Sequence, residues 1–161
     1  MQKKEPRPAR FLSKLDPERF ETVLDSISDG VFAVDRQWRV TYFNRAAEEI
    51  TGMSAAEALG LPCHRVFRTN ICHDACALRY TMETGRSVVN LAVYITDDHG
   101  ERKPVSISTG MFRDSDGTIV GGVESFRDLS VVESLRNALE RQHTFDDIVS
   151  KSPKMQRIFD I

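Results

Sequence analysis

The strand-like segments of this 161-residue chain fall into two groups, which short helical segments separate. The first group is a predicted hairpin, in which residues 31–34 and 39–43 flank the polar turn 35–37. The second group is a predicted meander of three strands, at residues 87–96, 103–112 and 118–126. Strands that are grouped apart from the helices favour an α+β fold. We therefore expect a five-stranded antiparallel sheet with short helices on one face.

Helix signals occupy the stretches around the two strand groups. Asp16-Pro17-Glu18 combines a capping residue, a proline in the first turn and an early acidic residue, which predicts a helix start. Between the strand groups, capping and apolar spacing predict three short helices, at residues 45–50, 55–59 and from Asp74 (or His73) to Thr84. Gly52 and Gly85 are the expected caps of the first and third.

Composition narrows the class of protein. Hydrophobic residues make up 40% of the chain, which is enough for a packed core. The 22 Lys and Arg residues against 24 Asp and Glu residues give a net charge of −2, which argues against a nucleic-acid or polybasic membrane partner. No apolar run approaches the ~20 residues that a membrane span needs, and none follows the basic start as a signal peptide would. We expect a cytoplasmic chain with no membrane contact.

A further helical segment, at residues 130–142, follows the last predicted strand. In this segment Val132, Leu135 and Leu139 recur at the spacing of a narrow coiled-coil seam. Two heptads alone are marginal in water, since isolated helices shorter than ~12–15 residues barely hold. We therefore expect a homodimer in which the first helix also takes part, through Phe20, Val23 and Leu24.

Four short motifs carry a resemblance to a known family. They are Ser28-Asp29-Gly30-Val31, residues 42–48 (YFNRAAE), Ile50-Thr51-Gly52 and Phe126-Arg127-Asp128-Leu129-Ser130. In this order they resemble a PAS sensor domain, although the closing motif usually reads Asp-Ile-Thr. The resemblance implies a PAS fold over residues 17–129, after a leader at 1–16. It also implies that Arg127 and Asp128 relay a signal to the helix that follows.

The last residues resemble a different family. Residues 145–156 (FDDIVSKSPKMQ) resemble the opening of the AAA+ ATPase domain of sigma-54-dependent, NtrC-type transcription activators, except that Ser150 is usually Gly there. The resemblance implies a signalling helix at 130–144, the start of an AAA+ domain at 145–161, and an ATPase output domain in the same full-length chain. Because no phosphate-binding or other catalytic motif occurs, we expect no enzymatic activity from these 161 residues.

Three cysteines are the sharpest chemical feature. Cys63, Cys72 and Cys76 lie within 14 residues, and clustered thiols in a reducing compartment indicate metal or redox chemistry more often than structural disulfides. If Cys72 and Cys76 share the first turn of a helix, both thiols fall on one face. Three thiolates supply most of the ligand set of a 4Fe-4S cluster, with His64, His73 or Asp74 as possible fourth ligands.

Several alternatives stay open. A zinc ion is equally compatible with this ligand count. A thiol–disulfide switch between two of the three cysteines is a further possibility for redox chemistry. The thiols can also be small buried hydrophobic groups, which would leave a cofactor-free dimerisation or protein-interaction module. A small organic ligand in an apolar pocket between helices and sheet is the last option. Among these we favour redox or oxygen sensing through a cysteine-ligated metal or iron–sulfur site.

Overall fold

The computed structural model describes the backbone of residues 16–151 and most side chains as far as residue 141. Its first two strands form the predicted hairpin, β1 (Gly30–Asp35) and β2 (Val40–Phe43), with Phe32 opposite Phe43. The turn is closed by the Asp35 amide, which donates to the Arg39 carbonyl oxygen at 3.0 Å.

The helices begin and end largely where capping chemistry predicts. Their bounds are α1 Pro17–Asp25, α2 Arg45–Thr51, α3 Ala55–Ala58, α4 Cys63–Val66, α5 Ala77–Thr84 and α6 Ser130–Lys151. Asn44 caps α2, and Ser54 with Glu57 forms the capping box of α3. Gly52 and Gly85 end α2 and α5 in left-handed conformations, which glycine adopts without steric cost.

The meander consists of β4 (Leu91–Thr96), β5 (Arg102–Arg113) and β6 (Ile119–Asp128). The strand β4 starts four residues later than the strand predicted at residues 87–96. The reason is Asn90, whose φ of +54° takes the chain out of the extended region just before the strand.

The sheet has six strands rather than the five we expected. Their order is β2-β1-β6-β5-β4-β3, and every neighbouring pair is antiparallel. The additional strand, β3, is only two residues long (Arg68–Thr69) and pairs with Thr96 and Ile95 of β4. Two residues are too few to show an alternating pattern, so this strand is defined by its partner and not by its own sequence. The α+β class and the PAS fold are confirmed.

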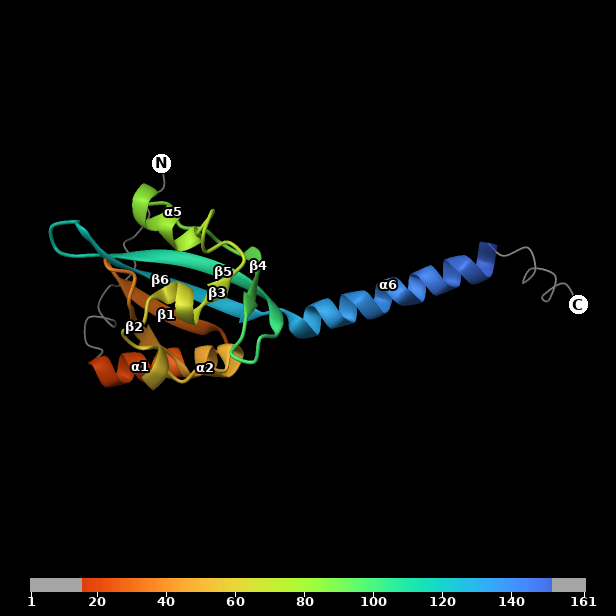
Figure 1. The fold of residues 1–161 in the computed structure, drawn as a ribbon, viewed down its shortest axis with the longest axis horizontal. Helices are drawn as coiled ribbons and strands as arrows, with labels where there is room; N and C mark the ends of the chain where they lie inside the picture. Colours follow the sequence, from red (N-terminus) through yellow and green to blue (C-terminus); the bar gives the residue numbers. More distant parts are fainter. Residues whose placement is uncertain (1–15, 152–161) are drawn as a thin grey trace, which may run out of the picture.

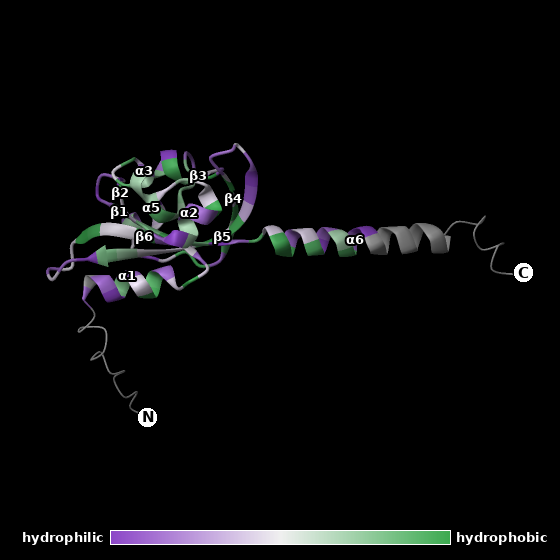
Figure 2. Cartoon of the chain, turned by 90° about the horizontal axis from the view of Figure 1, so that it is seen from below, coloured by the Kyte–Doolittle hydropathy of each residue, from purple (hydrophilic) through white to green (hydrophobic). Residues whose placement is uncertain are grey.

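The helices are unevenly placed around the sheet. Figure 1 shows the curled sheet with helices at its sides, and Figure 2 shows α2, α3 and α5 on one side of it and α1 on the other. The buried core lies between the sheet and the first group of helices. At its centre the rings of Phe32, Phe67 and Phe126 pack with centroids 4.5–6.2 Å apart. Gly30 lies against the Phe126 ring, where a Cβ would collide with it.

The last helix, α6, runs without a break from Ser130 to Lys151, past the expected boundary at residue 144. It points away from the sheet in both views (Figures 1 and 2). Within residues 16–151, no helix is both long and apolar enough to cross a membrane. Residues 1–15 of the predicted leader and the last ten residues of the predicted AAA+ segment lie outside the described part.

Candidate functional site

The three thiols come from two short elements and the turn between them. Cys63 opens α4, where its amide donates to the Trp38 carbonyl oxygen at 2.8 Å and so ties the helix to the β1–β2 turn. Cys76 occupies the capping position of α5, which begins at Ala77 and not at Asp74. All three cysteines are free and half-buried.

The late start of α5 changes the expected geometry. Cys72 lies in a turn, where its sulfur contacts the Thr69 hydroxyl at 2.9 Å and donates to the Phe67 carbonyl oxygen at 3.3 Å. Cys72 and Cys76 are therefore not one turn apart on a helix. The turn is stabilised locally by the Ala75 amide, which donates to the Ile71 carbonyl oxygen at 3.1 Å. This single bond has helical spacing, but no helix continues from it, and α5 begins only at Ala77.

The thiols nevertheless lie close enough to influence one another. The pKa of Cys63 is raised to about 12, mainly by burial and then by the neighbouring Cys76 and Cys72. The pKa of Cys76 is also raised, first by burial and then by nearby acidic groups that include Cys72. Both Cys63 and Cys76 pack against the hydrophobic core. At neutral pH these two thiols therefore carry their protons.

Glu124 is the residue that the sequence analysis missed. It is 4% exposed and lies on β6 between Phe32 of β1 and Thr109 of β5. No hydrogen bond reaches its carboxyl group from the described residues. Burial raises the pKa of Glu124 to about 8, and its charge raises the pKa of both Cys63 and Cys76. Within the described part of the chain, no ion pair reaches this buried carboxyl group, which acts on Cys63 and Cys76.

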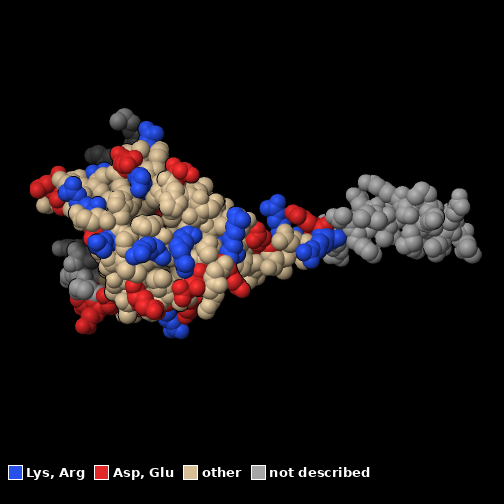
Figure 3. Space-filling view, in the orientation of Figure 1, with Lys and Arg blue, Asp and Glu red and all other residues tan. Residues whose placement is uncertain are grey.

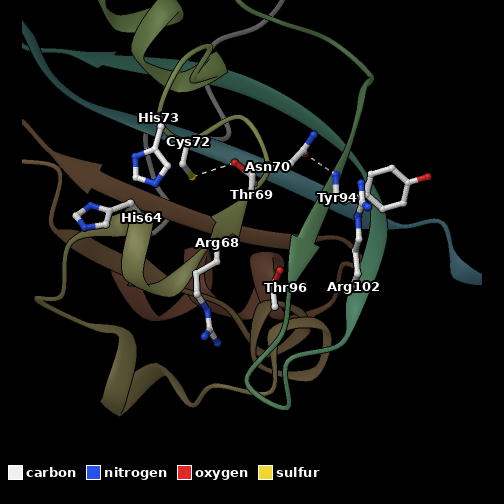
Figure 4. A pocket seen from close by; sticks show the side chains of 9 residues that line it. All are labelled: His64, Arg68, Thr69, Asn70, Cys72, His73, Tyr94, Thr96 and Arg102. Atoms are coloured by element: carbon white, nitrogen blue, oxygen red, sulfur yellow. Dashed lines mark hydrogen bonds between the residues drawn. The ribbon is translucent and has the colours of Figure 1, made fainter.

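The three proposed fourth ligands are in other positions. His64 and His73 are exposed and line an open groove together with Cys72, as Figure 4 shows, whereas Asp74 is exposed outside it. Across residues 16–151, no group of three or more His, Cys, Asp or Glu side chains is arranged so that it could hold a metal ion. The donor chemistry for a metal is present, but the side chains are not gathered around one point.

The expected relay residues lie at the end of β6. Arg127 forms a two-pronged ion pair with Asp29, with its Nε and one terminal nitrogen each 2.9 Å from a carboxylate oxygen. Asp128 instead accepts from the Ser130 amide at 2.7 Å and so caps the start of α6. No local sequence pattern predicts the Asp29–Arg127 pair, because 98 residues separate its partners.

A family model for the PAS domain matches residues 28–131. The chain belongs to the PAS domain family. It is 26% identical over 133 residues to the probable diguanylate cyclase DgcE of Escherichia coli, and 24% identical over 146 residues to the transcriptional activator RocR of Bacillus subtilis. These alignments cover 81% and 88% of this chain but only 12% and 31% of the two relatives.

Solved structures support the same fold. The PAS domain of a Colwellia psychrerythraea protein superposes with a TM-score of 0.61 at 15% identity, over 70% of this chain and 96% of that one. At this identity the likeness concerns the fold alone. PAS domains are sensory modules of signalling proteins, and this chain is one such module.

The predicted dimer seam of the PAS domain is open to solvent. Val132, Leu135 and Leu139 on α6 are 58–62% exposed, and Phe20 and Val23 on α1 are about half exposed. Leu24 is half-buried, and its carbonyl oxygen accepts from the Asn44 side chain at 3.0 Å. Exposed apolar rows at this spacing are what a helix presents when a partner covers it.

Proposed function

We propose that this PAS domain is the sensory part of a sigma-54-dependent transcription activator, and that it reads redox state or oxygen through Cys63, Cys72 and Cys76. A 4Fe-4S cluster bound by these thiolates is the sensor we favour, with zinc as the other metal. One observation carries the proposal: a buried carboxyl group on β6, the strand that leads into α6, lies close enough to Cys63 and Cys76 to raise the pKa of both thiols.

The charge balance supports a bound metal. In the metal-free protein, burial raises the pKa of Cys63, Cys76 and Glu124, and the charge of Glu124 raises the pKa of both thiols further. A metal cation would supply the missing positive charge and hold thiolates in their ionised form. Such a site would require Cys72 to move. Cys72 lies in a turn between β3 and α5, so no helix or strand holds its backbone in place. Glu124 joins His64, His73 and Asp74 as a candidate fourth ligand.

The same positions offer a route for the signal. A change in the ligation of Cys63 or Cys76 alters the surroundings of Glu124, three residues before Arg127 on β6. Arg127 and its partner Asp29 connect that strand to the segment after α1, and Asp128 caps α6. A switch between two packings at this point would be passed on to the output helix.

The assignment to a transcription activator has two supports. The tail resembles the opening of an AAA+ domain of such activators, and one relative by sequence is a transcriptional activator. The partner in this proposal is an ATPase domain of the same full-length chain. The PAS domain itself has no catalytic role and contacts neither nucleic acid nor membrane.

Metal analysis of anaerobically purified protein tests the metal site. We expect iron with acid-labile sulfide and a broad absorbance near ~400 nm, or zinc without colour. Cys63→Ser, Cys72→Ser and Cys76→Ser should each lose most of the same metal, because each removes one thiolate. His99→Ala, an exposed turn histidine outside the cluster, is the matched control and should retain it. Metal-free wild-type protein, or full metal content in all three serine variants, would refute the site.

A second function has its own observation. The exposed apolar row on α6 favours a PAS domain that acts through dimerisation, with or without a cofactor. Leu135→Asp combined with Leu139→Asp should raise the dimer dissociation constant about tenfold or more, because each buried leucine contributes ~1.5–3 kcal/mol. Ser134→Asp with Asn137→Asp adds the same charge on the other side of α6 and should change it little. Sedimentation that finds the wild-type chain monomeric at high concentration would rule the seam out.

A further inference from the structure

An open groove runs along the outer face of the sheet, at the edge formed by β3 and β4. Its volume is about 370 Å³. Tyr94 and Thr96 form part of its wall and alternate along β4 with the core residues Val93 and Ile95. Because side chains alternate across a strand, the groove opens on the face opposite the buried core. These strand residues therefore lie on the opposite side of the sheet from Glu124, although Cys72 of the thiol cluster also lines the groove.

The charged side chains that line the groove are of one sign. Arg68 and Arg102 line it beside the imidazole rings of His64 and His73, and no Asp or Glu does (Figure 4). Figure 3 shows several Lys and Arg side chains in a row across one face of the domain, with Asp and Glu side chains near them. A concave surface with cationic walls concentrates anions from solution.

Two arginines in the wall keep hydrogen-bond donors unused. Arg68 uses one terminal nitrogen to donate to the Asp97 carbonyl oxygen at 2.9 Å and to pair with an Asp98 carboxylate oxygen at 3.6 Å, but its Nε is buried and has no acceptor among the described residues. Arg102 stacks on Tyr94, with the guanidinium carbon 4.0 Å from the ring centroid, and forms no ion pair in the described part of the chain. When a guanidinium stacks flat on an aromatic ring, the N–H groups at its edge remain free to donate to a planar or tetrahedral oxyanion.

We propose that this groove binds a small oxyanion, a carboxylate or phosphate group, through Arg102 and Arg68. This goes beyond the proposed redox function and needs no metal. Thr69 and Asn70 add neutral polar groups to the wall, and the side-chain oxygen of Asn70 already accepts from the Tyr94 amide at 3.0 Å. The amide nitrogen of Asn70 is left to donate to the ligand.

The groove also has a connection to the output helix. The Tyr94 hydroxyl that extends beyond the Arg102 stack donates to Glu133 of α6 at 3.2 Å. An anion that engages Arg102 shifts the cation on Tyr94, and the Tyr94–Glu133 bond carries the change to the first turns of α6. Oxyanion binding is therefore expected to alter how α6 sits against β4.

Titration of chelator-treated protein with inorganic phosphate and with malonate tests the site without reference to any metal. Sodium chloride at equal ionic strength is the control for screening. We expect saturable binding, with chemical-shift changes at Thr69, Asn70, Tyr94 and Glu133. The relative affinities of the two probes identify a phosphate or a carboxylate as the preferred group.

Variants define the contribution of each arginine. Arg102→Gln and Arg68→Gln should each weaken binding about tenfold or more, as expected for a lost charge-assisted contact. Arg102→Lys keeps the positive charge but loses the paired N–H donors of the guanidinium, so it should lose less affinity than Arg102→Gln. Arg86 is exposed outside the groove, and the control variant Arg86→Gln should bind the probes as wild type does. Two results would overturn the proposal: shifts no larger than with chloride, or unchanged affinity in both glutamine variants. The shift map on wild-type protein stands even if a variant fails to fold.

Discussion

Glu124→Gln is expected to stabilise the metal-free PAS domain at pH 8 and above, and to do so progressively less as the pH falls toward 5. The folded protein holds the Glu124 proton up to a pKa of about 8, whereas an unfolded chain releases it near 4.5. Between these values the folded state binds more protons, so the free energy of unfolding falls as pH rises. The loss is at most about 1.4 kcal/mol for each pH unit in this window. Because glutamine does not titrate, the variant does not lose this stability as the pH rises.

Urea unfolding at pH 5, 6, 7 and 8 measures this difference. Glu83→Gln is the matched control, because Glu83 is exposed on α5 and should give the same small offset at every pH. Parallel stability curves for wild type and Glu124→Gln would mean that Glu124 is ionised in the folded domain. In that case the folded domain would already stabilise the charge on this carboxylate, and the argument that a metal cation is missing there would fail.

Asn44→Ala should cost about 2–4 kcal/mol of stability, since several buried hydrogen bonds are lost together. The Asn44 side chain is almost fully buried and accepts from the Val31 amide at 2.8 Å and the Ala47 amide at 2.9 Å. It also donates to the Leu24 carbonyl oxygen at 3.0 Å and the Asp29 carbonyl oxygen at 3.1 Å. A single residue thus caps α2 and fastens α1 to the first strand.

Asn44→Asp separates these two roles. Aspartate keeps the capping oxygen but can no longer donate to the end of α1 or to Asp29, so it should retain only part of the stability. Chemical unfolding of the three proteins gives the comparison. A loss below ~1 kcal/mol for Asn44→Ala would show that α1 and α2 are held mainly by apolar packing.

Local chemistry made much of the fold predictable. The first hairpin, the Asn44 and Ser54 caps and the terminal glycines Gly52 and Gly85 each depend on neighbours within a few residues, and each lies where the pattern placed it. By contrast, β3 owes its existence to β4, so no local signal announced it.

The candidate site was less predictable, because long-range pairing builds it. The cluster of cysteines was visible in their spacing, but the turn that separates Cys72 from α5 was not. Glu124 did leave a signal: it shares strand parity with the buried Phe126, and so it had to face inward. Reading polar residues at inward positions of a predicted strand would have found it.

The most direct test of redox sensing is hydrogen exchange, compared between anaerobically reduced and air-oxidised protein. The account predicts that residues 67–76 and residues 128–135 lose protection together on oxidation of the wild type, because the turn that carries Cys72 and the start of α6 both respond to the thiol site. In Cys63→Ser the two segments should exchange alike under both conditions. Identical exchange of wild-type protein in the two redox states would contradict the account.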